Sequence, residues 1–224
     1  MSTPSTTQQR VLKAAADIFA EKGFRDATIA EICERAGANI ASVNYHFGDK
    51  EKLYDEVWRH SFALAAASHP LDGGLPQNAT TEDCLYSYAN AILHRIFSED
   101  DTGLFAKLLY REMASPTLAL DRIAEEALQP QNQLLRNVLE KTLGAKFDET
   151  QLRLCMHSII GQCAFYNFSR PLRERVMGKK IIAKEETSKS TIGRLFFSGM
   201  HSLPVGQRYV GLQCSISDAI DGHK

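Results

Sequence analysis

The sequence predicts an all-α chain, with an N-terminal three-helix domain that contains a helix-turn-helix and a C-terminal helical bundle. Two observations support this fold class. Apolar residues recur at helical spacing through most of the 224 residues. The stretch ATIAEICERAGANIASVNYHFGDK, residues 27–50, divides into two short helices around a glycine turn. No segment before the tail shows the alternation of apolar and polar residues that is typical of a strand.

The first helix is expected over residues 7–22, followed by Gly23. Its apolar residues lie at helical spacing and are Val11, Leu12, Ala15, Ile18 and Phe19. Together with the two short helices that follow, it gives three helices at the start of the chain.

The first short helix is expected to begin after Thr28. Glu31 lies three residues further on, which is the spacing of a capping box. Gly37 predicts the end of this helix, because glycine adopts the left-handed conformation at little steric cost. Asn39 is a suitable N-cap for the second short helix.

The second short helix, residues 40–47, has few apolar residues that can be buried together. Val43 and Phe47 are four positions apart and therefore share a face. The outward residues are small, hydrogen-bonding or aromatic: Ile40, Ala41, Ser42, Asn44, Tyr45 and His46. Such a surface suits a helix that lies in the major groove of DNA. Taken alone, the pattern also fits an ordinary helical hairpin with a polar exposed side.

The block QQRVLKAAADIFAEKGFRDATIAEICERAGANIASVNYHFGDKEKLYDEVW resembles the N-terminal domain of the TetR family of transcriptional regulators. The resemblance rests on the alanine-rich first helix, Gly23-Phe24, Thr28-Ile29, Ala36-Gly37, the run from Val43 to Phe47, and Lys50 with Leu53-Tyr54. It implies a ligand-responsive regulator, most simply a repressor, that binds a palindromic operator in double-stranded DNA as a homodimer. A small hydrophobic effector would release it.

The resemblance also implies roles for individual residues of the helix-turn-helix. Thr28, Tyr45 and Lys50 are expected at backbone phosphates. The residues expected at base edges are Ile40, Ala41, Ser42, Asn44 and His46. Among these, Asn44 is the prime candidate for reading a base, whereas Asn39 is expected to cap rather than read.

The charge of the chain does not favour indiscriminate binding to nucleic acid, since the formal net charge is -1. A specific dimer needs only a local positive edge. The basic candidates for this edge are Arg10, Lys13, Lys22, Arg25, Arg35, Lys50 and Lys52. We therefore expect salt-dependent but modest non-specific binding.

After Lys50 the pattern predicts further helices and two loops, of which the one at 71–81 is the clearer. The helices are expected at 51–67, 81–97, 103–113, 116–143 with an interruption at Pro130, 148–169 and 184–200, and the loops at 71–81 and 171–183. The predicted domains are a DNA-binding domain at 5–65 with its helix-turn-helix at 28–47, an effector-binding and dimerisation domain at 66–203, and a loosely ordered tail at 204–224.

Residues 148–169 are apolar over more of the helix circumference than one neighbour covers, which predicts a dimer surface there. Gly161 would let another backbone approach. The predicted dimer residues are Met156, Ile160, Gly161, Cys163, Ile192 and Phe196. An alternative is that this helix is simply central in its own bundle.

An effector pocket is predicted where aromatic and methionine side chains of the bundle meet. Its candidate residues are Tyr88, Phe105, Leu109, Met113, His157, Phe165 and Tyr166. The stretches LLYREMASPT and HSIIGQCAFYNFSRP are similar to the C-terminal domain of a TetR subfamily linked to antibiotic sensitivity and efflux genes, which suggests a drug-like compound or a hydrophobic metabolite. Plain core packing is the competing interpretation for each residue.

Other chemistry finds little support in the sequence. No constellation of nucleophile, base or phosphate loop indicates an enzyme, and no cofactor, catalytic residue or metal site is expected. A metal-sensing variant using Cys155, His157 and Cys163 is disfavoured, because residues 155 and 157 point in nearly opposite directions on a helix. A helical scaffold remains an alternative. The pair Arg111-Glu112 is expected to be a solvated ion pair rather than an effector anchor.

The sequence also indicates where in the cell the protein is expected. No apolar stretch is long enough to span a bilayer, and the first ten residues lack the order of a secretory signal, so no membrane partner and a cytoplasmic location are expected. The five cysteines form no Cys-x-x-Cys pair and no disulfide framework.

Overall fold

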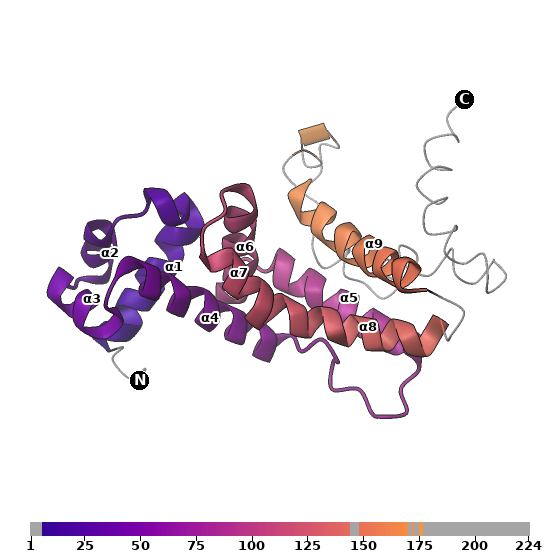
Figure 1. Ribbon diagram of the computed structural model, residues 1–224. Helices are drawn as coiled ribbons and strands as arrows, with labels where there is room; N and C mark the ends of the chain where they lie inside the picture. The colour runs from indigo at the N-terminus through magenta and orange to yellow at the C-terminus, as the bar shows by residue number, and fades with distance from the viewer. Residues whose placement is uncertain (1–5, 144–147, 170–171, 173–174, 177–224) are drawn as a thin grey trace. The chain divides into compact units, whose positions relative to one another are not determined.

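The computed structural model describes residues 6–143, 148–169, 172 and 175–176 (Figure 1). Within these residues the chain forms helices and no strand, which confirms the predicted all-α fold class. The described chain divides into two compact units, one of residues 6–69 and 98–131, the other of residues 70–97, 132–143, 148–169, 172 and 175–176. Each unit has its own apolar core. The predicted domain boundaries stay predictions.

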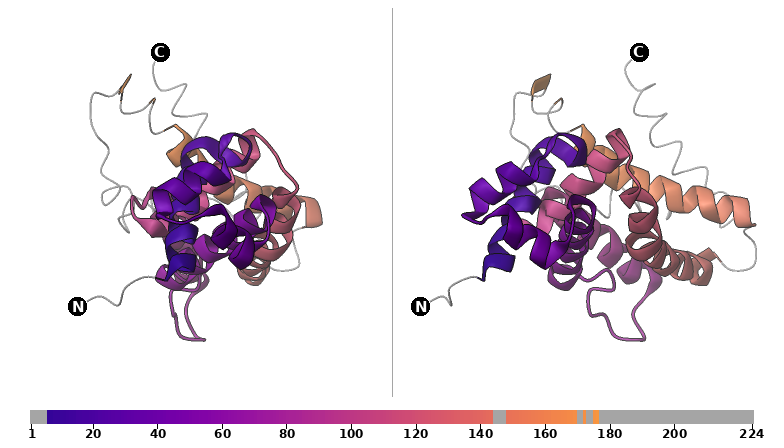
Figure 2. Two further views of the ribbon diagram at one scale, coloured as in Figure 1. Left: turned by 90° about the vertical axis from the view of Figure 1, so that its left-hand side faces the viewer. Right: turned by 60° about the vertical axis from the view of Figure 1, so that its left-hand side comes forward.

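The first unit begins with the three predicted N-terminal helices. They are α1 (Thr7–Asp26), α2 (Ile29–Ala36) and α3 (Ile40–Phe47), which lie together in the views of Figures 1 and 2. α1 continues four residues beyond the predicted end. It does so through a kink at Gly23, whose φ of 81° is accessible to glycine at low cost.

The remaining helices of the first unit are α4 (Lys50–Ser68), α6 (Leu104–Ala114) and α7 (Ala119–Ile123), with a single 3₁₀ turn at Asp101–Gly103. α1 packs against α2, α4 and α6, and α4 packs against α6 and α7. The core between them centres on large side chains that are almost fully buried. These include Phe19, Tyr54, Trp58, Leu108 and Ile123. The rings of Phe19 and Tyr54 meet edge to face at 4.8 Å.

The helix predicted over 116–143 is interrupted before Pro130, as expected. A π-helical segment, Ala124–Leu128, follows α7, and α8 (Gln129–Leu143) then carries Pro130 in its first turn. Proline has no N–H for the carbonyl four residues earlier, and its ring clashes with that carbonyl in a regular helix. The wider turn before Pro130 therefore accommodates it without ending the helical path.

The second unit contains α5 (Thr81–Phe97), α9 (Glu149–Phe168) and the larger part of α8. Both α5 and α9 match their predicted ranges closely, and the predicted loop precedes α5. α5 packs against α9. Side chains buried in this core include Leu85, Tyr88, Leu135, Leu139 and Cys163.

Several sequence predictions fall outside the described residues. These are the helix at 184–200, with Ile192 and Phe196, and the tail at 204–224. Within the predicted loop at 171–183, the described residues 172, 175 and 176 have helical backbone. Among all described helices, none combines the length and the apolar character needed to cross a membrane.

Candidate nucleic-acid interface

Thr28 and Glu31 form the predicted capping box at the start of α2. The Thr28 hydroxyl accepts from the Glu31 N–H at 3.2 Å, and the Glu31 carboxylate accepts from the Thr28 N–H at 3.1 Å. Lys22 of α1 also donates to this carboxylate. These bonds, the one from Lys22 foremost, lower the pKa of Glu31 to about 2. The capping box therefore fixes both the start of α2 and its attachment to α1.

The turn between α2 and α3 has the geometry expected from its glycine. Gly37 adopts a left-handed conformation, with φ 59° and ψ 42°. The Ala38 N–H then reaches the Cys33 carbonyl at 2.9 Å, which closes the end of α2. Asn39 caps α3, because its side-chain oxygen accepts from the Ser42 N–H at 2.7 Å. The predicted capping role of Asn39 is thereby confirmed.

α3 buries one edge and exposes the other. Val43 and Phe47 are 0% and 7% exposed, whereas Ile40 and Tyr45 are 54% and 85% exposed. The other residues predicted to face outward are exposed at Ala41, Asn44 and His46, and half-buried at Ser42. α3 is thus anchored by two apolar side chains and presents a surface of mixed polar and aromatic groups. A helix with this surface is able to enter a major groove.

Lys50 begins α4, as predicted, but its side chain lies partly against the protein. Its Nζ donates to the Arg25 carbonyl at 3.3 Å and sits 4.6 Å from the centroid of the Phe24 ring. Partial burial lowers the pKa of Lys50. The side chain is therefore held in a defined position beside the end of α1, and its role at a phosphate stays a prediction.

The positive edge is weaker than the sequence alone suggests. Arg35 makes a two-pronged contact with Glu21 at 2.8 and 3.0 Å. Three of the other predicted cations also pair with acids: Lys13 with Asp17 and Asp101, Lys22 with Glu31, and Lys52 with Asp49. Local neutralisation leaves less charge for phosphates. Neutral donors on α3 must therefore carry more of any contact with DNA.

The predicted effector residues are divided between the two units. Phe105 and Leu109 belong to the core of the first unit, where Phe105 packs on Phe62 with ring centroids 5.0 Å apart. Tyr88 is buried in the core of the second unit. The other residues with described side chains are exposed: Met113, His157 and Phe165. The side chain of Tyr166 lies outside the described residues. The location of an effector pocket stays a prediction.

One predicted dimer residue is corrected by the structure. Cys163 is 1% exposed, because it points into the core of its own unit, and burial raises the pKa of its thiol. Gly161 lies on the exposed side of α9, where an added methyl group would meet nothing within 4 Å. Met156 and Ile160 are half-buried. Further apolar side chains are exposed on this helix at Leu154, Phe165 and Phe168.

The three residues considered for a metal site lie apart. Cys155 and Cys163 are buried in the core of the second unit, whereas His157 is exposed on another side of α9. Among the described residues, no three His, Cys, Asp or Glu side chains are grouped as metal ligands would be.

The sequence analysis missed a buried carboxylate in the first unit. Glu112 is 1% exposed and accepts hydrogen bonds from Tyr54 and Thr117. Arg111 points elsewhere and donates to the carbonyls of Ala20 and Glu21. The expectation of a solvated Arg111–Glu112 ion pair is therefore wrong. Glu112 falls on the same helix face as Leu108 and Phe105, a spacing that was available as a signal of burial.

The class of protein follows from this geometry: a helix-turn-helix protein with an exposed second helix and a separate helical unit. Residues 11–57 match the family described as bacterial regulatory proteins, tetR family. Residues 81–195 match the C-terminal domain of the HTH-type transcriptional dual regulator CecR. The chain belongs to the TetR family of DNA-binding transcriptional regulators.

Curated relatives with assigned names agree with this class. The HTH-type transcriptional dual regulator CecR of Shigella flexneri is 26% identical over 185 residues, which are 76% of this chain and 82% of the relative. The HTH-type transcriptional repressor NicS of Pseudomonas putida is 29% identical over 170 residues, which are 73% and 77% of the two chains. Both relatives are named as transcriptional regulators.

Solved structures share the fold at lower identity. The transcriptional regulator FadR from Bacillus subtilis, in complex with stearoyl-CoA, has a TM-score of 0.63 at 16% identity and covers 86% of this chain and 98% of its own. The TetR family regulator PfmR from Thermus thermophilus has a TM-score of 0.60 at 17% identity, with coverages of 86% and 97%.

Proposed function

We propose that this protein is a repressor that binds a palindromic operator as a homodimer and is released by a small hydrophobic effector. The observation that carries the proposal is the surface of α3. Val43 and Phe47 anchor α3 in the core, whereas Asn44, Tyr45 and His46 are exposed on it. These side chains are thereby exposed on a helix whose position is fixed by its buried edge.

In this proposal, some residues of the helix-turn-helix contact bases and others contact phosphates. Asn44 reads a base edge, for which its amide offers both a donor and an acceptor. His46 and Ser42 add hydrogen bonds, and Ile40 and Ala41 contact thymine methyl groups. Tyr45, Thr28 and Lys50 contact phosphates and set the register of the helix. Since its partner is the chromosome, the regulator acts in the cytoplasm.

A homodimer is supported by α9. Leu154, Phe165 and Phe168 expose apolar surface at 46%, 63% and 75%, and Gly161 leaves open space beside them. Contiguous exposed apolar surface is typical of a protein–protein interface. A two-fold dimer places its two reading helices on half-sites about one helical turn apart, which is why its operator is palindromic.

Release by a hydrophobic effector is supported by relatives of the same fold. FadR from Bacillus subtilis was solved in complex with stearoyl-CoA, a long-chain acyl compound. We assign to this chain an effector of hydrophobic character, a metabolite or a drug-like compound. If such a ligand favours a dimer whose reading helices no longer fit adjacent grooves, it weakens operator binding by its coupling free energy.

The test is a gel shift with DNA that flanks the gene. Wild-type protein should retard a specific fragment, and Asn44→Ala and Tyr45→Ala should each abolish specific retardation. Asn132→Ala, at an exposed position of α8, is the matched control and should leave it unchanged. Circular dichroism verifies that each variant keeps its helical content.

Two outcomes would count against the proposal. Retardation that survives both α3 substitutions would mean that α3 does not read DNA, and would favour the alternative of a helical scaffold. A shift that is abolished equally by unrelated competitor DNA would exclude a specific operator.

A further inference from the structure

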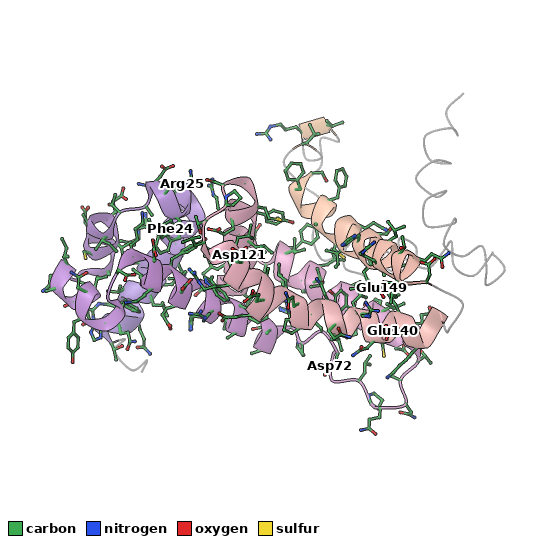
Figure 3. All side chains as sticks on the ribbon, in the orientation of Figure 1. Phe24, Arg25, Asp72, Asp121, Glu140 and Glu149 are labelled. Carbon is green, nitrogen blue, oxygen red and sulfur yellow. The ribbon has the colours of Figure 1, made fainter. Side chains whose placement is uncertain are left out.

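The first unit contains a pocket lined by none of the predicted effector residues; of the predicted site residues, it includes only Arg25, a candidate for the positive edge. Its volume is about 490 Å³, and it lies between the end of α1, the start of α4 and the segment Pro116–Arg122. Small-molecule sites in proteins commonly have volumes of about 300–1,000 Å³. Figure 3 marks Phe24 and Arg25 at the end of α1 and Asp121 on neighbouring α7. All lining residues belong to the same compact unit.

The lining combines aromatic, apolar and cationic groups. Phe24 and Tyr54 contribute rings, and Leu118 contributes an apolar side chain that is 70% exposed. The charged residues of the lining are Arg25, Arg122 and Glu51. The charged lining is therefore positive by one unit. A lining that combines apolar side chains with two guanidinium groups suits a ligand with an apolar body and an anionic group.

The two arginines are held in place but keep donors available. Arg122 donates from Nε and Nη2 to one oxygen of Asp55, at 3.1 and 2.9 Å. Arg25 donates from Nη2 to the Pro116 carbonyl at 3.2 Å. A guanidinium has five N–H groups, so each arginine can make further bonds without losing these contacts. Planar carboxylates are the ligands that match the fork of an arginine.

We propose that this pocket, the α1–α4–α7 pocket, binds a small aromatic carboxylate. The ring packs between Phe24 and Leu118, and the carboxylate binds the guanidinium groups of Arg122 and Arg25. A neutral aromatic of the same size forms no charge-assisted bonds to the two guanidinium groups. An aromatic cation would be repelled by both arginines; the nearby carboxylates are Glu51 and Asp55, and Asp55 is already bonded to Arg122.

A ligand in the pocket affects α3, the helix proposed to read DNA, through Lys50. Phe24 and Arg25 line the pocket and are also the two residues that hold Lys50, through the ring and the backbone carbonyl. A carboxylate that repositions them repositions Lys50, at the start of α4, directly after α3. This consequence rests on the proposed binding to DNA, whereas ligand binding itself does not.

The binding experiment uses phenylacetate as the probe and phenylacetamide as its neutral isostere, with full-length protein and no DNA. Titration calorimetry gives the affinity. The intrinsic fluorescence gives the location, because the chain has one tryptophan, Trp58, whose indole N–H donates to Asp55 at 3.0 Å. Asp55 is the partner of Arg122, so a carboxylate at Arg122 should change the Trp58 emission. Phenylacetamide should bind at least about tenfold more weakly.

Three arginine variants locate the site. Arg25→Gln, at an exposed position, should weaken phenylacetate binding about tenfold, and Arg122→Gln should weaken it at least as much. Arg153→Gln, at an exposed position of α9, removes the same charge elsewhere and should leave the affinity unchanged. Arg25→Lys should recover part of the loss, because it restores the charge but not the planar fork.

The results separate this inference from the proposed function. Absence of phenylacetate binding, equal affinity for the amide, or equal loss in Arg153→Gln would overturn the pocket assignment even if operator binding is intact. Binding that depends on Arg25 and Arg122 in a protein that retards no DNA would support the pocket and refute the regulator. Where both hold, phenylacetate should change operator affinity in wild type and not in Arg122→Gln.

Discussion

Tyr54 donates a 2.8 Å hydrogen bond from its phenol to the Glu112 carboxylate, and each of the two residues is 1% exposed. The other Glu112 oxygen accepts from the Thr117 N–H at 3.0 Å. Burial, and then the bond to Glu112, raise the pKa of Tyr54. One carboxylate thus joins α4, α6 and the segment that leads into α7. α4 directly follows α3, the helix that is proposed to read DNA. The contact between Tyr54 and Glu112 therefore helps to hold α4, and with it α3, in position.

Tyr54→Phe should destabilise the protein by about 1–3 kcal/mol, because it removes a donor from a buried carboxylate without changing the packing. Urea unfolding followed by circular dichroism gives the free energy of unfolding. Tyr45→Phe removes the same hydroxyl from a side chain that is 85% exposed and should have no measurable effect. Equal stability of wild type and Tyr54→Phe would show that water or another group satisfies Glu112.

Gly37→Ala should cost about 1–2 kcal/mol, because a left-handed backbone brings a Cβ close to the following carbonyl oxygen. An added methyl group at Gly37 meets nothing else within 4 Å, so backbone strain is the whole effect. Gly37→Asn should cost less, since asparagine tolerates this conformation better. Thermal unfolding of the three proteins checks this order. An alanine variant as stable as wild type would mean that the turn has relaxed to another conformation.

The helix-turn-helix was predictable because its signals are local. Thr28 with Glu31, Gly37, and Asn39 each determine one helix end through bonds to residues three or four positions away. The same holds for Val43 and Phe47, whose spacing alone puts them on one face. The extent of α5 and α9 was also predictable, because their apolar periodicity is long.

Contacts between distant parts of the chain were not predictable in this way. Glu112 was assigned to the surface, since nothing local shows that Tyr54, 58 positions earlier, supplies a buried donor. Cys163 was assigned to a dimer surface, because α9 is apolar around most of its circumference and periodicity does not choose the inward side. The α1–α4–α7 pocket draws its lining from three separate segments, none of which forms a motif.

Glu31 should make the protein lose stability in acid. Its folded pKa of about 2 lies below the ordinary glutamate value of 4.5, so the carboxylate binds its proton more readily in the unfolded chain. The stabilisation is fully present above pH 4.5 and is lost as the pH falls from 4.5 towards 2. Urea unfolding at several pH values in this window measures the slope.

Glu31→Gln provides the reference for that slope. The glutamine keeps an acceptor for the Thr28 N–H but does not titrate, so the stability of this variant should fall less steeply over the same pH window. All other carboxylates titrate in both proteins and cancel in the comparison. Parallel pH profiles would show that Lys22 and Thr28 do not hold the Glu31 charge in solution.

Phe165→Glu should convert the proposed dimer into a monomer and thereby abolish specific operator binding. Phe165 is 63% exposed on α9, and burying a phenylalanine contributes roughly 1.5–3 kcal/mol. A two-fold interface contains each residue twice, so the substitution removes about 3–6 kcal/mol of association free energy. A dimer of the variant would also have to bury two glutamate charges. Sedimentation velocity gives the oligomeric state. Leu75→Glu, at a loop residue that is 38% exposed, introduces the same charge and should remain dimeric. A dimeric Phe165→Glu protein would place the interface elsewhere, whereas a monomer that still binds the palindrome with wild-type affinity would show that one reading helix suffices.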